Sequence, residues 1–519
     1  MKSLLLAGFM GTGKTTVGPL VAERLGLPFV DTDDLVAKRA GASVPEIFRR
    51  EGEAKFRERE REVLESLLAG APHVVALGGG TLLARDLRHR ALDRAVVVTL
   101  TSSPAEILRR VGDVSTRPNL ASADPARRIH ELLEARADAY AECHASLSTE
   151  GVDPDEIAQA AAAVHARDPI ALPLGARTYV IDVVRDAPES LTDAIARLAP
   201  SSLVVVSDAT VHRARGASLE RALNHLALPK VDVTLPHGEA HKTLATAQTI
   251  WDAALGAGVD RDTLIVSFGG GVTSDLAGFA AATLLRGVRF VSSPTTLLAM
   301  VDASVGGKTG VDHPAGKNLI GAIHQPSGVV VDTAHLATLP AREMRAGLAE
   351  VVKIALATSA ELFERLERDA AALLDPASDA LFHAVRESIV LKAQVVRDDE
   401  RENGRRAILN LGHTIGHALE AGGGFHKHLH GEAVALGTVR ELDVTVRAGA
   451  TPPDVLARTE RLFRALGLAT EVPADELRAA MRFVGADKKR RGARIRVPVV
   501  TAVGCSDVRE LSPEVFRVP

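Results

Sequence analysis

Short apolar runs alternate with glycine-rich and polar segments along the first two thirds of the chain. Runs of this length, bounded by turn residues, are typical of buried strands in a parallel sheet. The pattern predicts strands at residues 3–7, 28–30, 74–77, 178–184, 203–207, 263–268 and 290–292. Longer segments between them have room for helices, and beyond about residue 334 we expect helices throughout. The predicted fold class is therefore α/β, followed by an all-α region.

The length of the chain predicts several domains, because 519 residues are too many for one hydrophobic core. An alanine-rich amphipathic stretch at residues 154–166 predicts a helix that closes a first unit. A short junction marked by prolines follows, with no Gly/Ser spacer. Such a junction limits how far the two halves can move apart. We expect a P-loop domain with a doubly wound parallel sheet at 1–166, a Rossmann-like α/β nucleotide domain at 167–334 and an all-α metal-binding domain at 335–519.

Composition narrows the class of protein. Hydrophobic residues make up 46% of the chain and charged residues 25%, as in ordinary soluble globular proteins. The formal net charge of −4 argues against a nucleic-acid partner. We expect no membrane span, because no apolar run approaches ~18 residues, and no signal peptide, because the apolar N-terminus lacks a cleavage region. Cys143 and Cys505 provide no disulfide framework, so we expect a cytoplasmic protein.

A phosphate-binding loop follows the first predicted strand. Residues 8–15 fit the Gly-x4-Gly-Lys-Ser/Thr pattern, in which glycines let backbone N–H groups point at phosphate oxygens. Lys14 can reach the outer phosphates, and the hydroxyl of Thr15 suits Mg2+. The alternative is a glycine-rich turn in an ordinary strand–helix unit. Asp31 and Asp33 end the second strand beside this loop, where one can hold Mg2+ through water and another can accept from substrate hydroxyls.

A second anion site in the same unit is indicated by glycines and arginines. Residues 78–80 are all glycine, as the close approach of a ligand to the backbone would require. Arg57, Arg117 and Arg136 carry guanidinium groups, which bind carboxylate and phosphate in a bidentate fork. Taken singly, each arginine also fits an exposed helix charge.

Together these residues resemble shikimate kinase over essentially the whole first unit. The resemblance implies ATP binding by Gly11, Thr12, Gly13, Lys14, Thr15, Thr16, Arg110 and Arg117, with Mg2+ on Thr15 and, through water, on Asp31. It implies a shikimate pocket of Asp33, Arg57, Gly79, Gly80 and Arg136. Asp33 would orient or deprotonate the attacking hydroxyl, while Lys14, Arg117 and Mg2+ would neutralise charge on the transferring phosphoryl group.

A second nucleotide-binding pattern follows the strand at residues 263–268. Residues 269–275 contain Gly-x-Gly-x-x-Ser, which differs from the dinucleotide fingerprint by Ser274 in place of the third glycine. Asp208 is well placed for a ribose hydroxyl, although the usual acid follows the glycine loop. Farther along, lysines and an asparagine among glycines form a polar rim that suits a phosphorylated, hydroxylated small substrate.

Five histidines lie between residues 405 and 432. His413 and His417 stand four residues apart in a predicted helix, so both rings project from one face. His430 lies beyond a glycine break, on an element that can fold back toward that face. Neutral imidazole suits zinc, and Glu350 is the best upstream carboxylate to complete a site with an open position. The spacing leaves the choice between His413 and His417 open, and any single histidine also fits a surface or core role.

The chain beyond residue 167 resembles 3-dehydroquinate synthase along almost its full length. The resemblance rests on residues 269–275, 294–298, 301–308, 347–353, 410–417 and 429–432. It implies that Glu350, His413 and His430 hold Zn2+, with Co2+ as the alternative. It assigns NAD to Asp208, Glu239, Lys242, Gly270, Gly271, Asp275, Thr295, Thr296, Lys317 and Thr338. The implied substrate residues are Asp302, Lys308, Asn318, Lys353, Lys392, Arg406, Asn410, His417, Lys488 (or its neighbour Lys489) and, from a neighbouring subunit, Arg286.

The two resemblances imply a bifunctional enzyme that uses ATP, Mg2+, NAD and Zn2+ on small-molecule substrates, with a homodimer through the synthase half. The implied catalytic residues of the second half are Lys308, Lys353, Lys392, Arg406, Asn410 and His417. A polyol dehydrogenase is one alternative, but an uncharged polyol needs no basic clamp of lysines and arginine. A nucleotide-sensing module with a structural zinc is the other, and turnover by each half would exclude it.

Overall fold

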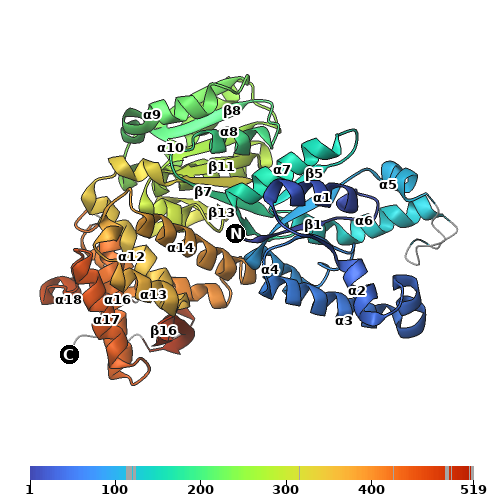
Figure 1. The fold of residues 1–519 in the computed structure, drawn as a ribbon. Coiled ribbons are helices and arrows are strands. Elements are labelled where there is room, and N and C mark those ends of the chain that lie inside the picture. The colour runs from blue at the N-terminus through green and yellow to red at the C-terminus, as the bar shows by residue number, and fades with distance from the viewer. Residues whose placement is uncertain are drawn as a thin grey trace. The chain divides into compact units, whose positions relative to one another are not determined.

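The computed structural model describes residues 1–112, 120, 124–314, 316–424, 426–484, 490–491, 494–512 and 515 (Figure 1). The chain folds into two compact units, Met1–Asp182 and Val183–Pro519. The finer domain limits at residues 166 and 334 remain predictions. Within the described part of the chain, no helix has both the length and the apolar character needed to cross a membrane.

The first unit is a parallel five-stranded sheet with helices on both faces. Its strands, in the order β2-β3-β1-β4-β5 across the sheet, are β1 (Ser3–Ala7), β2 (Phe29–Asp31), β3 (Val74–Ala76), β4 (Ala95–Thr101) and β5 (Ala145–Ser148). Its helices are α1 (Lys14–Leu25), α2 (Thr32–Ala40), α3 (Val44–Ala69), α4 (Arg85–Arg94), α5 (Pro104–Val111), α6 (Pro125–Ala141) and α7 (Pro154–Arg167). The doubly wound sheet is confirmed, and α7 confirms the helix predicted at 154–166.

Strand β1 is buried on both faces and organises the core of this unit. Leu4 and Leu6 pack with residues of α1 and α7, whereas Leu5 and Ala7 pack with residues of α3 and α4. This alternation follows from the two-residue repeat of a strand. Because β1, β2 and β3 are parallel neighbours, their carboxyl ends meet at one edge. The loops that follow these three strands therefore lie together.

The second unit contains a seven-stranded sheet, which also includes strands of the connecting segment. The strands, in the order β6-β7-β14-β11-β10-β8-β9, include β6 (Ile170–Leu172), β7 (Tyr179–Val184), β8 (Leu203–Asp208), β9 (Lys230–Leu235), β10 (Leu264–Gly269), β11 (Arg289–Pro294) and β14 (Gly328–Asp332). Helices α10 (Leu244–Gly256) and α11 (Gly271–Thr283) pack on one face, and α8 (Glu189–Ala196) and α9 (Ala209–Leu223) on the other. A hairpin of β12 (Lys308–His313) and β13 (Gly316–Ile323) forms a separate small sheet.

Helices follow the sheet and carry the predicted metal ligands. They are α12 (Ala341–Thr358), α13 (Ala360–Arg368), α14 (Asp379–Asp398), α15 (His413–Gly422), α16 (His430–Arg447), α17 (Pro453–Ala465) and α18 (Ala474–Val484). Short helical turns are η3 (Glu239–His241), η4 (Leu284–Arg286), η5 (Ala299–Ala303), η6 (Thr333–Thr338), η7 (Ala372–Leu374) and η8 (Arg405–Asn410). All the predicted strands and the helix at His413 are confirmed.

The expectation that the chain is helical throughout beyond residue 334 was wrong. An antiparallel sheet of β15 (Arg490–Arg491), β16 (Arg494–Ala502) and β17 (Cys505–Leu511) follows α18. Ile495, Val497 and Val499 are each 0% exposed and alternate along β16, so one face of the strand enters the core beside α15 and α18. This two-residue repeat of β-branched residues outweighs the helical context of the preceding chain.

The first turn of α15 is held by close contact with α16. Gly437 of α16 approaches the carbonyl of Gly412 so closely that a Cβ atom would lie 2.0 Å from that oxygen. Glu441, one turn farther along α16, is 1% exposed. Its carboxylate accepts hydrogen bonds from the backbone nitrogens of Gly412, Thr414 and Ile415 at 2.8, 2.9 and 3.1 Å. The carboxylate caps helix α15, which begins at His413, and thereby fixes the backbone position from which the His413 ring projects.

We expect Gly437→Ala to destabilise the second unit although alanine is the better helix former. The new methyl group would meet backbone atoms that cannot rotate away, so the free energy of unfolding should fall by about 2 kcal/mol. Gly216 of α9 is the matched control, since its Cβ would meet nothing closer than 3.7 Å. Gly216→Ala should stabilise by about 0.5–1 kcal/mol. Calorimetric melting of both variants checks this, and equal melting temperatures would contradict it.

Candidate active sites

The phosphate loop lies between β1 and α1, as the sequence predicts. Gly8, Gly11 and Gly13 have φ angles of 129°, 78° and 91°, in the region that side chains rarely adopt. A Cβ atom on Gly8 would also lie 2.3 Å from a carbonyl oxygen at the end of β4. Lys14 Nζ donates to the carbonyl oxygens of Gly8 and Phe9 at 3.0 and 2.9 Å. The loop is therefore shaped by its own backbone, with the lysine folded over it.

The two aspartates lie at the carboxyl end of β2. Asp31 accepts a hydrogen bond from the backbone nitrogen of Asp33 at 2.8 Å, and burial raises the pKa of Asp31. Asp33 Oδ1 is buried and accepts no hydrogen bond from the described residues. Burial, together with the carboxylates of Glu60 and Asp31, raises the pKa of Asp33 to about 6. A carboxylate with a pKa near neutrality is well suited to accept a proton from a hydroxyl group.

Two arginines reach the glycine segment that follows β3. Arg57 pairs with the buried Glu60 at 2.5 Å, and a Cβ atom on Gly80 would lie 2.4 Å from its guanidinium carbon. Arg136 is 7% exposed and donates to the carbonyl oxygen of Gly79 at 3.2 Å. The structure thus brings both predicted acceptor arginines to the glycine segment, where a side chain at residue 80 would displace the Arg57 guanidinium.

The remaining predicted nucleotide ligands of the first unit lie around the same loop, with one exception. Arg110 Nη1 lies 3.4 Å from the carbonyl oxygen of Gly11. Thr12 is buried, whereas Thr15 and Thr16 are exposed in the first turn of α1. Arg117 lies outside the described residues, so its place at a lid stays a prediction.

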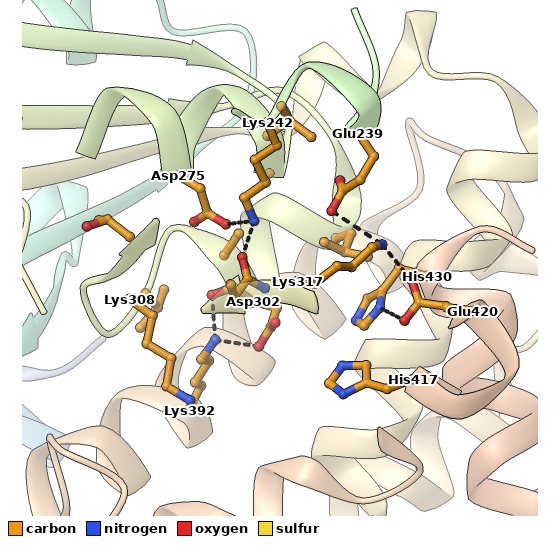
Figure 2. A pocket seen from close by; sticks show the side chains of 17 residues that line it. Glu239, Lys242, Asp275, Asp302, Lys308, Lys317, Lys392, His417, Glu420 and His430 are labelled. Carbon is orange, nitrogen blue, oxygen red and sulfur yellow. Dashed lines mark hydrogen bonds and ion pairs between the residues drawn. The ribbon is translucent and has the colours of Figure 1, made fainter. Parts of the chain in front are cut away.

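A cavity of about 240 Å³ in the second unit brings the α/β and helical parts together (Figure 2). Side chains from η3, α11, η5, the β12–β13 hairpin, α14, α15 and α16 line it. The predicted site residues among its lining are Glu239, Lys242, Gly271, Asp275, Asp302, Lys308, Lys317, Asn318, Lys392, His417 and His430. Predicted nucleotide, substrate and metal residues therefore share one cavity.

Ion pairs connect the nucleotide side of this cavity. Lys242 is 4% exposed and lies 2.5 Å from Asp275 and 2.5 Å from the side-chain oxygen of Asn318 (Figure 2). Lys317 contacts Glu239 at 3.3 Å and Glu420 at 3.0 Å. Burial by itself would lower the pKa of Lys242, yet the Asp275 carboxylate raises it. These lysines remain charged because carboxylates from several elements face them.

The substrate side of the cavity is also crowded with charge. Lys392 of α14 pairs with Asp302 of η5, a π-helical turn of the kind often found at functional sites. Lys353 and Glu350, one turn apart on α12, form a fully buried pair. Lys308, whose side chain is partly exposed, pairs with Glu402.

Two other predicted substrate residues lie beside this group. Arg406 is buried and donates to the carbonyl oxygens of Gly306 and Glu400 at 3.2 and 2.5 Å. Asn410 donates to Glu402, the carboxylate that also faces Lys308. The structure therefore places several lysine and arginine side chains at or beside this cavity, as a substrate with both a phosphate and a carboxylate would require.

Three side chains from three helices converge on one point of the helical part. Glu350 Oε1 is buried, and it lies 3.4 Å from His430 Nε2 and 3.8 Å from His413 Nε2. These ligand atoms all lie within 4.8 Å of one another. The opposite ring nitrogens are held elsewhere: Nδ1 of His413 by the carbonyl of Leu411 at 3.1 Å, and Nδ1 of His430 by Glu420 at 3.3 Å. Imidazoles anchored through Nδ1 point Nε2 at the carboxylate, as in histidine metal sites.

A second set of three residues meets the same distance criterion. His417, Glu420 and His430 also offer ligand atoms within 4.8 Å of one another, but His417 is exposed. Burial by itself would lower the pKa of His430, while hydrogen bonds with Glu350 and Glu420 raise it to about 10. His430 thus belongs to both sets, and the structure narrows the choice among histidines by burial.

The remaining predicted NAD residues lie at the carboxyl ends of neighbouring strands. Asp208 ends β8 and caps α9, and Gly270 caps α11 directly after β10. Thr295 and Thr296 follow β11, and a Cβ on Gly270 would lie 3.2 Å from Thr296. Strands β8, β10 and β11 are adjacent, so these residues share the edge where such sheets bind nucleotides. Thr338 ends η6.

Five predicted substrate residues are not among those that line the cavity: Lys353, Arg406 and Asn410, described above, and also Arg286 and Lys488. Arg286 is exposed, has a φ of 68° and is not among the residues that line the cavity. Lys488, like Lys489, falls in a segment that the structure does not describe. Ser274, which replaces the fingerprint glycine, is accommodated in the first turn of α11 and is 5% exposed.

Several acidic residues of the two sites are absent from the sequence-based expectations. Glu60 lies three residues after Arg57 on the same helix, and Glu420 lies three after His417, so helical spacing could have found both. Glu402 has a φ of 58° in a loop, and no spacing rule points to it. Glu441 accepts hydrogen bonds from backbone groups at the start of α15, and this role emerges from the fold alone.

Comparison with known proteins identifies a family for each unit. Residues 10–165 match the family model for shikimate kinase. Residues 232–346 and 347–490 match those for the N-terminal and C-terminal parts of 3-dehydroquinate synthase. The chain is 46% identical over 304 residues to the 3-dehydroquinate synthase of Bordetella pertussis, covering 59% of this chain and 85% of the relative. The 3-dehydroquinate synthase of Teredinibacter turnerae is 44% identical over 335 residues, which cover 64% of this chain and 92% of that relative.

Solved structures show the same likeness for the second unit. ValA, the 2-epi-5-epi-valiolone synthase of Streptomyces hygroscopicus with NAD+ and Zn2+ bound, is 29% identical, with a TM-score of 0.59 over 65% of this chain and 94% of ValA. Fold and sites define a chain with a phosphate-loop kinase unit and a nucleotide- and metal-binding synthase unit. The chain belongs to the 3-dehydroquinate synthase family, and its first unit carries a shikimate kinase domain.

We expect Glu420→Gln to weaken metal binding. The amide would no longer supply a charged acceptor for His430 Nδ1, so the dissociation constant for Zn2+ should rise about tenfold. Glu476→Gln is the matched control, because Glu476 accepts from His428, which is not a member of either candidate ligand set. Competition of each purified variant with a chromogenic chelator measures the constants. Equal affinities for both variants would contradict the role of Glu420.

Proposed function

We propose that the residues of the two sites carry out the two reactions of these families. The first unit transfers a phosphoryl group from ATP to the 3-hydroxyl of shikimate. The second converts 3-deoxy-D-arabino-heptulosonate 7-phosphate to 3-dehydroquinate and phosphate, with NAD regenerated in each turnover. The observation that carries the second assignment is the cavity in which buried cations, nucleotide-side residues and His430 converge.

In the kinase, the acceptor and the phosphates have separate protein partners. Asp33, with its raised pKa, accepts the proton of the attacking hydroxyl. Arg57 and Arg136 hold the carboxylate of shikimate above the glycine segment. Lys14 and Arg117 stabilise charge on the transferring phosphoryl group, and Thr15 and Asp31 hold Mg2+, Asp31 through water.

In the synthase, Glu350, His413 and His430 fit a divalent metal ion. Glu350 and His413 are buried and His430 is partly buried, and a donor set of one carboxylate and two imidazoles would leave a position open for substrate. When bound, Zn2+ or Co2+ would polarise the secondary hydroxyl of the substrate, and NAD+ would accept its hydride. Lys308, Lys353, Lys392 and Arg406 hold phosphate and carboxylate, while Asn410 and His417 orient the substrate. The metal and NAD+ of the homologous ValA structure support this assignment.

The same fold could also serve a polyol dehydrogenase, which would release NADH. The lysines and arginine gathered around the cavity favour the phosphorylated acid, because a neutral polyol needs no such set of cations. The test is release of inorganic phosphate from the seven-carbon phosphorylated substrate with NAD in catalytic amount. We expect many turnovers per NAD and no accumulated NADH. Stoichiometric NADH without phosphate would overturn the assignment.

The two activities should fail independently. Glu350→Ala removes the one carboxylate of the buried Glu350–His413–His430 set, so synthase turnover should fall at least about a hundredfold. Kinase turnover should persist, because its site draws only on the first unit. Lys14→Ala should give the reverse pattern, so each variant is the control for the other. Both activities are assayed on each purified chain, and loss of both in Glu350→Ala with a folded first unit would sink the proposal.

We further propose a cytoplasmic homodimer formed by the synthase halves. The exposed Arg286, outside the lining of its own cavity, supports a role in a neighbouring site. Both cysteines are free thiols, as is typical of a reducing compartment.

Subunit mixing tests the shared site. Arg286→Ala chains and Lys353→Ala chains should each be inactive as synthases. After random exchange, half of the dimers are mixed, and each mixed dimer has one intact site, so about a quarter of wild-type activity should return. Mass tags on the two chains verify that exchange took place. Exchange without recovered activity would argue against a contribution of Arg286 across subunits.

A further inference from the structure

The segment that connects the kinase core to the rest of the chain forms a closed turn within the first unit. After β6, the hydroxyl of Thr178 accepts from the backbone nitrogen of Leu174 at 3.0 Å and donates to the carbonyl of Gly175 at 2.6 Å. Ala171 of β6 packs against the core cluster of β1, β3 and α4. The turn is therefore a defined structure anchored on the kinase core, and not a free linker.

This turn is bound by acidic side chains at the end of α6. Gly175 donates its backbone N–H to Glu142 Oε1 at 2.9 Å, and Ala176 donates to Asp138 Oδ1 at 3.2 Å. Gly175 has a φ of 62°, and a Cβ atom there would lie 3.1 Å from the Asp138 carboxylate. A side chain at this position would strain the backbone and crowd the Asp138 carboxylate, so the contact is sensitive to substitution of Gly175.

Glu142 continues the connection toward the shikimate pocket. Its carboxylate, 6% exposed, accepts from Arg88 Nε at 2.6 Å. Arg88, itself 6% exposed, donates to the carbonyl oxygens of Leu82 and Leu83 at 2.7 and 3.1 Å. Burial alone would raise the pKa of Glu142. His89, Arg88 and the backbone N–H of Gly175 lower this pKa to about 2, so the carboxylate stays charged.

The segment held by Arg88 is the one that carries the acceptor glycines. At its other end, the carbonyl oxygen of Gly79 accepts from Arg136 at 3.2 Å and from Tyr140 at 2.6 Å, both on α6. The glycine segment is thus tied to α6 directly and, through Arg88, to Glu142 just after that helix. The backbone of the turn at residues 174–178 also binds Glu142 and Asp138, through Gly175 and Ala176.

We propose that the connector turn at residues 174–178 is a positioning element of the kinase, which sets the geometry of the shikimate pocket through Glu142 and Arg88. The inference rests on the proposed acceptor site. In this chain the segment that leads to the synthase thereby contributes to the support of the pocket. Disturbing it should weaken binding of the acceptor and leave the nucleotide side, which lies on the phosphate loop, unaffected.

The first test changes the connector and no pocket residue. In the full-length chain, Gly175→Ala should raise the KM for shikimate about tenfold, as expected for loss of a charge-assisted hydrogen bond, while the KM for ATP stays unchanged. Gly151→Ala is the control, because Gly151 has a φ of 70° and nothing within 4 Å of its Cβ position. It carries the same backbone strain without the contact. A shikimate KM equal in both variants, or a parallel rise in the KM for ATP, would overturn the proposal.

The second test removes the negative charge of Glu142, which links Gly175 of the connector turn to Arg88. Glu142→Gln should raise the shikimate KM by a similar factor, whereas Glu134→Gln, on an exposed face of α6, should not. An unchanged KM for ATP in each variant reports that its first unit is folded. Asp33→Asn separates the two levels of the argument. If Asp33→Asn keeps full turnover, the acceptor site itself is misassigned. If it abolishes turnover but Glu142→Gln leaves the shikimate KM unchanged, only the connector's role falls.

Discussion

Charges removed from water must find partners, and this requirement organises the synthase unit. Glu350, Lys353, Lys242 and Lys392 are all at most 5% exposed. Each has a counter-charge, and the partners often come from distant segments, as when Lys392 of α14 meets Asp302 of η5. Loss of one partner would leave an uncompensated buried charge at a cost of several kcal/mol, about 3–5. The α/β part and the helical part of this unit are therefore joined by electrostatics as well as by packing.

Local chemistry made much of this molecule predictable. A phosphate loop needs glycines at fixed spacing, and a central parallel strand must be apolar on both faces, so β1 and the loop at residues 8–15 stand out in the sequence. The carboxyl ends of adjacent strands coincide in space, which is why residues as distant as Asp208 and Thr295 could be expected at one edge. In these cases the relevant information lies within a few residues or follows from a general rule of topology.

Other features depend on contacts that spacing does not record. Glu402 meets Lys308 and Asn410 only because a loop turns back through a left-handed residue. Burial separates His413 from His417, and burial is a property of the packed helices α12, α15 and α16. The strand β16 was missed although its alternating residues were visible, because the surrounding helical pattern dominated the interpretation. The features missed most often were the glutamates that pair with cations of the two sites, because nothing in the sequence around them distinguishes them from surface glutamates.

A single polypeptide carries both sites, so each act of translation delivers them in a ratio of one to one. Differential expression or degradation cannot alter that ratio. The relative capacity of the two reactions in a cell must instead be set by the intrinsic turnover and substrate affinity of each unit. Selection on metabolic flux would then act on side chains that tune one unit without changing the other. The hydrogen bonds of Gly175 and Ala176 to Glu142 and Asp138 lie close in sequence to the point where the first unit passes into the second.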